Sequence, residues 1–255
     1  MAQVDPYNCI RKTIDLAAVI AECDRLFNAN APELLGEHLR KYRTLAQQYG
    51  DKSSELSLLK ELIGHYRMQG DPVRGRQAVM DALVLVEFLN VKNTISGGTI
   101  LINAATALSA FGESNEALEL YNRAGACYKN NLPADDKLFA GLYNNMASVY
   151  LALADFAEAR KLYLQALEIL QKNNDLMDSA VTYVNLAQLA YQADDIPQID
   201  IFLDKAMELF NAPAAERNGY YAHSCSKCAP VFGFFEREND EKLLMQRAED
   251  FYSAT

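Results

Sequence analysis

The segment "HSCSKC" (His223–Cys228) has the residue types and spacing that could bind a metal ion. Two cysteines stand in a C-x2-C arrangement after a histidine, and thiolate and imidazole are common zinc ligands. A structural zinc site needs four ligands, and the sequence offers no second Cys/His pair. Cys225 and Cys228 also fall on the apolar stripe of a predicted helix, where free cysteine behaves as a small hydrophobic residue. We therefore favour core cysteines over a metal site or an enzyme built on His223, and we expect no metal.

The remaining histidines and acidic pairs do not form a catalytic arrangement. His38 and His65 lie on separate predicted helices without a nearby cysteine or a hydrolase signature, which favours packing or surface roles. The pairs Asp135–Asp136 and Asp194–Asp195 precede helical segments, where carboxylates cap backbone amides. The "SGG" segment at Ser96–Gly98 lacks the Lys–Ser/Thr ending of a phosphate-binding loop. We expect a protein that is not an enzyme, with no catalytic residues and no cofactor.

Side-chain amides are the more informative polar groups. The segment "LYNNMASVY" (Leu142–Tyr150) places Asn144 and Asn145 inside an otherwise helical pattern. Asparagine is unfavourable there, because its short amide competes for nearby backbone groups. The same amide carries a donor and an acceptor, which together complement one peptide unit. These residues could therefore bind the main chain of a peptide.

The elements that must position these amides are helical hairpins repeated along the chain. Two series of mostly small apolar residues recur in one register, with a repeat of about 40–42 residues. They are Ala82, Ala124, Ala166, Ala206 and Ala248 in the second helices, and Ile63, Ala105, Ala147, Ala187 and Ala229 in the first helices. Turns are predicted at Gly70–Asp71, Gly112–Glu113, Ala154–Asp155 and Asp194–Asp195. Small residues let helices approach closely, and stacking of hairpins buries the apolar side that a lone hairpin leaves exposed.

This pattern resembles the tetratricopeptide repeat. The likeness lies in the large–small spacing before the turn, as in "YNNMASVY" and "YVNLAQLAY", and in the Ala–aromatic–Ala spacing of "ARKLYLQA" after it. It extends over roughly residues 52–253 and is strongest in 97–210. The repeat is longer than the usual length of about 34 residues and is similar to those of kinesin light chains and bacterial peptide-pheromone receptors. The resemblance implies an all-α protein, a right-handed α-solenoid of stacked antiparallel helix hairpins.

Two segments make up the expected solenoid. Residues 1–50 contain a further helix pair, separated by "NANAP" at 28–32, which we expect to cap the first repeat. Residues 51–255 would form about five hairpins continuous with that cap, so that the whole chain is a single domain of about twelve helices. The segment "NNLPADD" at 130–136 is predicted to link two hairpins and not to separate domains.

The repeat separation places Asn145 in a column of equivalent residues. Asn103 lies one repeat before it and Asn185 lies one repeat after it, and the column ends in Glu61 and Lys227. First helices line the concave surface of tetratricopeptide solenoids, so the resemblance implies that this column faces a groove holding an extended peptide. The peptide-binding residues predicted on this basis are Asn103, Asn145, Asn185, Asn144, Ser148, Gln188, Tyr191 and Lys227.

Other interpretations of the column remain open. A repeated asparagine can bond to the neighbouring hairpin and fix the stacking of the repeats without any ligand. The chain can also act as an assembly scaffold through its convex surface, its helix edges or self-association. The family's clamp for C-terminal carboxylates is disfavoured, because the cations in or near this column, Lys60, Arg67 and Lys227, are spread between its opposite ends.

Composition limits the partners and the compartment. A net charge of −10 argues against non-specific nucleic-acid binding. The resemblance to the tetratricopeptide repeat implies a protein or peptide as the partner. The longest apolar run, Ala82–Val86, is too short to span a membrane, and the opening "MAQVDPYNCIRK" lacks the features of a secretory signal. Five cysteines without a disulfide pattern fit a reducing compartment. We expect a cytoplasmic protein and leave its partner and oligomeric state open.

Overall fold

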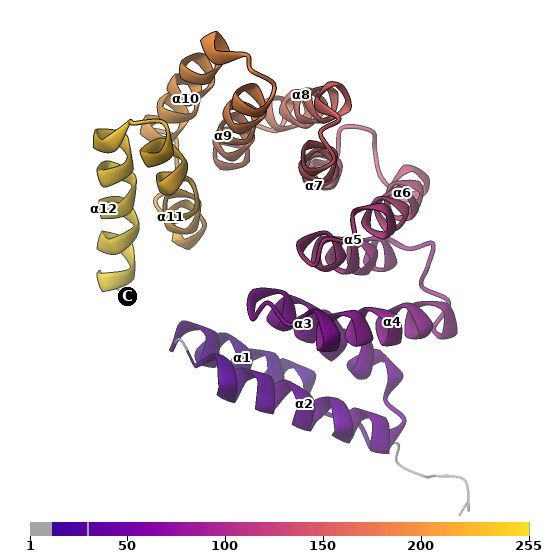
Figure 1. The fold of residues 1–255 in the computed structure, drawn as a ribbon. Helices are drawn as coiled ribbons and strands as arrows, with labels where there is room; N and C mark the ends of the chain where they lie inside the picture. The colour runs from indigo at the N-terminus through magenta and orange to yellow at the C-terminus, as the bar shows by residue number, and fades with distance from the viewer. Residues whose placement is uncertain (1–11, 30, 255) are drawn as a thin grey trace, which may run out of the picture. The chain divides into compact units, whose positions relative to one another are not determined.

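A computed structural model describes residues 12–29 and 31–254, and all regular secondary structure in these residues is helical (Figure 1). Most of the opening segment considered as a possible secretory signal lies outside the described residues. The helices group into two compact units that meet in sequence at Asn131 and Leu132, and each unit is described here by itself. Within the described residues, the predicted all-α fold of antiparallel helix hairpins is confirmed.

Six helices make up the described part of the first unit. They are α1 (Leu16–Asn28), α2 (Pro32–Tyr49), α3 (Lys52–Met68), α4 (Pro72–Phe88), α5 (Ile95–Ala110) and α6 (Ser114–Asn131). Consecutive helices pair as the hairpins α1–α2, α3–α4 and α5–α6, as Figure 1 shows. Helix α3 also packs against α2 and α5, so the first helices of the second and third hairpins are neighbours. The cap function of residues 1–50 stays a prediction.

Six helices also form the second unit. They are α7 (Lys137–Ala152), α8 (Phe156–Lys172), α9 (Leu176–Gln192), α10 (Ile196–Asn211), α11 (Gly219–Phe234) and α12 (Glu238–Ala254). The hairpins are α7–α8, α9–α10 and α11–α12, and α9 contacts both α7 and α11. The division between the units falls inside the "NNLPADD" segment. The continuity of residues 51–255 as one domain therefore stays a prediction.

The turns inside the five hairpins from α3–α4 to α11–α12 share one hydrogen-bonded form. Each contains a residue with a left-handed backbone, namely Gly70, Gly112, Ala154, Asp194 or Glu236. The following amide donates to a carbonyl five residues earlier, as from Asp155 to Tyr150 at 2.9 Å, which satisfies a carbonyl at the end of the first helix. The Asp155 carboxylate then accepts from the amide of Glu158 at 3.2 Å and caps the next helix. The four predicted turns lie where the sequence placed them.

The repeated small residues form the core of the hairpins. Every member of the two series is at most 3% exposed, and the large residues beside them, Tyr121 and Tyr163, are 1% exposed. Close helix approach at the small residues and filling by the aromatic rings explain this packing. The packing predicted from the repeat separation is confirmed. No helix in the described part of the chain is both long and apolar enough to cross a membrane.

Candidate functional site

Asn145 and Asn185 occupy equivalent places on the neighbouring helices α7 and α9. Each is followed by two buried residues, and the burial of Met146 and Ala147 fixes the orientation of α7 at this point. Both asparagines are half-buried, and among the described residues neither side-chain amide has a hydrogen-bond partner. The two amides are therefore able to donate to and accept from a ligand.

Asn144 has a different environment from its neighbour Asn145. Its Nδ2 donates to Thr182 Oγ1 on α9 at 2.9 Å, and Thr182 is fully buried. The Thr182 hydroxyl in turn lies 2.7 Å from the carbonyl oxygen of Asp178, to which it can donate its proton. Asn144 thus joins the first helices of two adjacent hairpins, which is the packing role considered above as an alternative for these asparagines.

The Ser148 hydroxyl is also engaged within its own hairpin. Its Oγ lies 3.0 Å from the hydroxyl of the buried Tyr163 on α8 and donates to the Asn144 carbonyl at 3.1 Å. The equivalent pair in the first unit, Thr106 and Tyr121, is 2.9 Å apart. Burial raises the pKa of Tyr121 to about 12. Neither pair is among the contacts predicted from the sequence. The repeat separation relates Thr106 to Ser148 and Tyr121 to Tyr163, so it could have indicated that the two hairpins share this contact.

The other predicted residues of the second unit lie on α9 and α11. Gln188 is half-buried, and Lys227 is exposed on α11. Tyr191 is 49% exposed, and its ring packs edge-on against Phe234 and Phe235, with centroids 5.2 and 5.6 Å apart. Two of the three rings in this cluster are thus supplied by the next hairpin, which makes an exposed aromatic surface at the end of α9.

Asn103 lines a pocket of about 290 Å³ in the first unit. The pocket is formed by residues of the neighbouring helices α3 and α5, which are Lys60, Glu61, Gly64, Arg67, Asn103 and Thr106. The side chains of Lys60 and Glu61 form an ion pair at 3.0 Å. Glu61 and Asn103, two members of the predicted column, thus line one open pocket within this unit. Lys60 and Arg67 line this pocket, whereas Lys227 belongs to the other unit.

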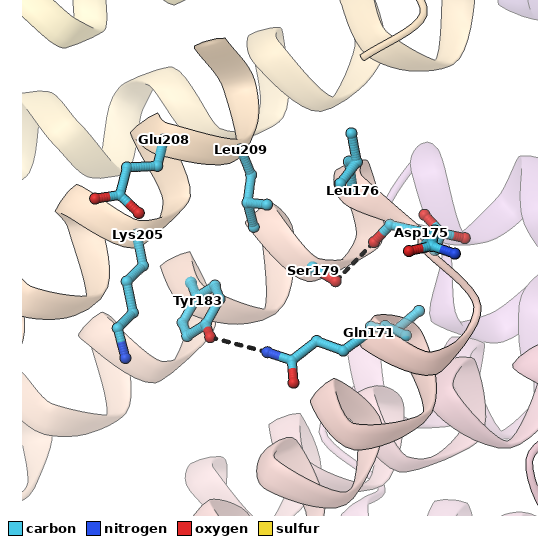
Figure 2. A pocket seen from close by; sticks show the side chains of 10 residues that line it. Gln171, Asp175, Leu176, Ser179, Tyr183, Lys205, Glu208 and Leu209 are labelled. Atoms are coloured by element: carbon cyan, nitrogen blue, oxygen red, sulfur yellow. Dashed lines mark hydrogen bonds between the residues drawn. The ribbon is translucent and has the colours of Figure 1, made fainter. Parts of the chain in front are cut away.

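A second pocket, of about 360 Å³, lies in the second unit among α8, α9 and α10 (Figure 2). Tyr183 forms part of its wall, where Gln171 Nε2 donates to the phenol oxygen at 3.3 Å and the Lys205 ammonium lies 5.5 Å from the ring centroid. Tyr183 and Asn185 are two residues apart on α9, so their side chains point to opposite sides of the helix. This pocket is therefore distinct from the predicted peptide surface.

The cysteines and histidines considered for chemistry are mostly part of the packing. Cys225 and Cys228 are buried, and burial raises the pKa of Cys225 to about 11 and that of Cys228 to about 12. His223, two residues before Cys225, is exposed. His38 Nε2 lies 3.1 Å from the Val19 carbonyl oxygen. Within residues 12–29 and 31–254, no three His, Cys, Asp or Glu side chains are placed to hold a metal ion.

A family model of the tetratricopeptide repeat matches residues 138–212. This match covers the hairpins α7–α8 and α9–α10, which carry Asn144, Asn145, Ser148, Asn185, Gln188 and Tyr191. No curated protein sequence matches the chain.

Solved structures of repeat proteins share the fold at low sequence identity. BtubC from P. vanneervenii is 17% identical, with 95% of this chain and 92% of that chain covered and a TM-score of 0.53. A putative kinesin light chain from Podosopora anserina is 15% identical, with 78% of this chain and 95% of that chain covered and a TM-score of 0.56. The quorum sensor NprR has been solved in apo form from B. thuringiensis and in complex with its cognate peptide NprX. NprR in the complex is 15% identical, with 94% of this chain and 69% of that chain covered and a TM-score of 0.60. At these identities the likeness establishes the fold.

Proposed function

We propose that this chain, a tetratricopeptide-repeat protein, is a non-catalytic binding module that captures an extended peptide along the first helices of its hairpins. The repeats matched by the family model carry most of the predicted contact residues. The fold is shared with NprR, which has been solved in complex with its cognate peptide. Both findings support a protein or peptide as the partner.

The observation that carries the proposal is the pair of amides on Asn145 and Asn185. They are half-buried at equivalent places on contacting helices, and the described residues offer neither of them a hydrogen-bond partner. A half-buried amide gains free energy when it pairs, and a peptide unit supplies both the acceptor and the donor that it needs. The pocket around Asn103 supports an equivalent open surface in the first unit.

Side chains of the peptide must supply most of the affinity. Each amide contact contributes about 1 kcal/mol, so the asparagines alone give weak binding and set mainly the direction and register of the ligand. The exposed ring of Tyr191, with Phe234 beside it, offers a wall for an apolar anchor, and Gln188 and Lys227 offer further polar contacts. Asn144 and Ser148, whose polar groups are engaged inside the protein, would hold the shape of this surface.

The charge of the chain narrows the class of peptide. With a net charge of −10, the protein attracts neutral or basic segments more readily than acidic ones. We include in the proposal that nucleic acids and membranes are not partners and that the protein acts in the cytoplasm.

The first prediction uses the two amides directly. Selection of a displayed library of random dodecapeptides on the wild-type protein should enrich peptides that bind it with micromolar affinity. The double variant Asn145→Ala/Asn185→Ala should bind the enriched peptides about 30-fold more weakly, because two contacts of about 1 kcal/mol are lost. Fluorescence anisotropy of labelled peptides would measure the change.

The matched control is Asn122→Ala, which removes an exposed asparagine from α6, a second helix of its hairpin. This variant should bind the same peptides with wild-type affinity, and circular dichroism should show that all variants remain folded. Equal affinity of the double variant and the wild type would reject the amides as the peptide-binding groups.

An assembly scaffold acting through the outer surface is the second candidate function. One observation favours it, because α4 exposes four large apolar side chains along its outer face, which are Val73, Met80, Val84 and Phe88. Exposed apolar surface of this extent is typical of sites that bind another protein. This candidate does not depend on the asparagines.

A further inference from the structure

The outer face of α4 is an apolar stripe made of Val73, Met80, Val84 and Phe88. Their exposed fractions are 80%, 55%, 66% and 70%. Separations of seven, four and four positions place all four on one face of the helix, over about 22 Å of its length. The opposite face of α4 is buried in the first unit through residues such as Ala78 and Ala82. The stripe is thus additional to the face that the core requires.

The repeats themselves show that the stripe is unusual. At the equivalent places the next two hairpins have mostly polar or small residues, namely Asn115, Asn122, Ala126 and Asn130, and then Ala157, Leu164, Glu168 and Lys172. Of these, Leu164 alone is large and apolar. The repeat architecture therefore does not need large apolar groups at these places, and their cluster on α4 indicates a contact with another surface.

Charges at the two ends of the stripe have opposite signs. Near Val73, Arg76 pairs with Glu113 at 2.5 Å and lies 3.8 Å from Glu116, so one cation stands among two anions. Near Phe88, Glu87 pairs with Lys92 at 2.8 Å and Arg123 at 3.5 Å, so one anion stands among two cations. The net charge of the three side chains is therefore −1 at the end near Val73 and +1 at the end near Phe88.

We propose that this face binds α4 of a second copy of the same chain in an antiparallel pair. A two-fold axis close to Met80 and Asp81 places Val73 opposite Phe88 of the second copy, so that a small side chain meets a large one at both ends. The same axis places the −1 group against the +1 group of the second copy, because both groups lie on the same side of the stripe. This proposal does not rest on the peptide-binding function.

A parallel pair lacks these complementary features. It would place Phe88 at the level of Phe88 of the second copy, and charge groups of equal sign at equal heights. Antiparallel helices also align their macrodipoles favourably. Four side chains from each copy cover less area than the ~1,600 Å² of a standard interface. We therefore expect a dissociation constant on the order of 1–100 μM.

Sedimentation equilibrium of the full chain between 1 and 300 μM tests the self-association. The wild type should pass from monomer to dimer, and Met80→Lys should weaken the dimer on the order of 100-fold, because two cations enter the centre of an apolar contact. The matched control is Leu164→Lys, which introduces the same charge at the equivalent exposed place of α8 and should leave the association unchanged.

Disulfide crosslinking tests the orientation, in a Cys9→Ser background because the described native cysteines are all buried. Met80→Cys should crosslink to itself, and Val73→Cys should crosslink to Phe88→Cys when the two proteins are mixed. Crosslinking of Val73→Cys only to itself would replace the antiparallel pair by a parallel one and overturn the proposal. A wild type that is monomeric at the highest concentration, or a dimer equally strong in Met80→Lys, would reject α4 as the self-association surface.

Discussion

Two adjacent asparagines on α7 have different surroundings, and the difference lies in which neighbour each side chain can reach. Asn144 points to the Thr182 hydroxyl of the next hairpin, 2.9 Å away, whereas the Asn145 side chain has no hydrogen-bond partner among the described residues. A helix turns about 100° per residue, so adjacent side chains point in clearly different directions. One asparagine therefore joins two hairpins, and the other is available for a ligand.

Removal of the hydroxyl at Thr182 tests this division at the residue scale. Thr182→Val keeps the shape of the side chain but leaves the Asn144 amide without its partner, so it should lower the free energy of unfolding by about 1–2 kcal/mol. Urea denaturation followed by circular dichroism would measure the loss. In a protein that already carries Asn144→Ala, Thr182→Val should lower the free energy of unfolding by less, because the hydrogen bond between the two side chains is already absent.

Asn145→Ala provides the comparison for that measurement. It removes an amide without a described partner, and its unfolding free energy should remain within about 0.5 kcal/mol of the wild type. A loss from Asn145→Ala as large as that from Thr182→Val would show that Asn145 also serves packing, and the peptide-binding proposal would lose its main support.

At the scale of the helices, the turns are the points where one residue type is most strongly favoured. The left-handed position is glycine in two hairpins, at Gly70 and Gly112, but alanine in the hairpin α7–α8, where Ala154 has a φ of 59°. A Cβ atom in this conformation crowds the neighbouring carbonyl oxygen, which costs roughly 1–2 kcal/mol. The turn between α7 and α8 is thus maintained by its hydrogen bonds, although alanine is unfavourable at its left-handed position.

Ala154→Gly should therefore stabilise the protein by about 0.5–1 kcal/mol, the gain in the turn being partly offset by the larger entropy of glycine in the unfolded chain. The reverse change, Gly112→Ala, should destabilise it by a similar amount, since a Cβ at Gly112 meets no atom within 4 Å and only the backbone conformation is penalised. Thermal denaturation of both variants would check the pair. Changes of equal sign would contradict this explanation.

The helices, their turns and their buried series could be predicted from the sequence because each depends on residues close together in the chain or on one repeated separation. The partner of Asn144 could not be predicted in this way. The repeat equates Asn144 with Val184, whereas the contact is made diagonally with Thr182, two residues earlier. The pocket beside Tyr183 likewise depends on how three helices meet (Figure 2). The α4 stripe could have been predicted from the sequence, since the repeat separation identifies which positions of the second helices face outward.

For the whole molecule, the division at Asn131 is a property that repetition alone does not reveal. The repeat separation continues unchanged from Ala105 to Ala147, yet the helices group into two compact units on either side of this link. Repeat proteins gain stability from each hairpin and from contacts with its immediate neighbours, and about three hairpins are needed for a stable fold. Each unit has three.

Residues 132–255 should consequently fold without the first unit. This fragment retains α7 to α12 and all residues matched by the family model, so it should show a helical circular dichroism spectrum and one cooperative thermal transition. A fragment that begins at Phe156 keeps α8 but lacks its hairpin partner α7, and it should be markedly less stable because the packing around Ala166 is opened. If the longer fragment is unfolded under conditions where the full chain is native, the two units are one cooperative structure, and the solenoid is continuous across Asn131.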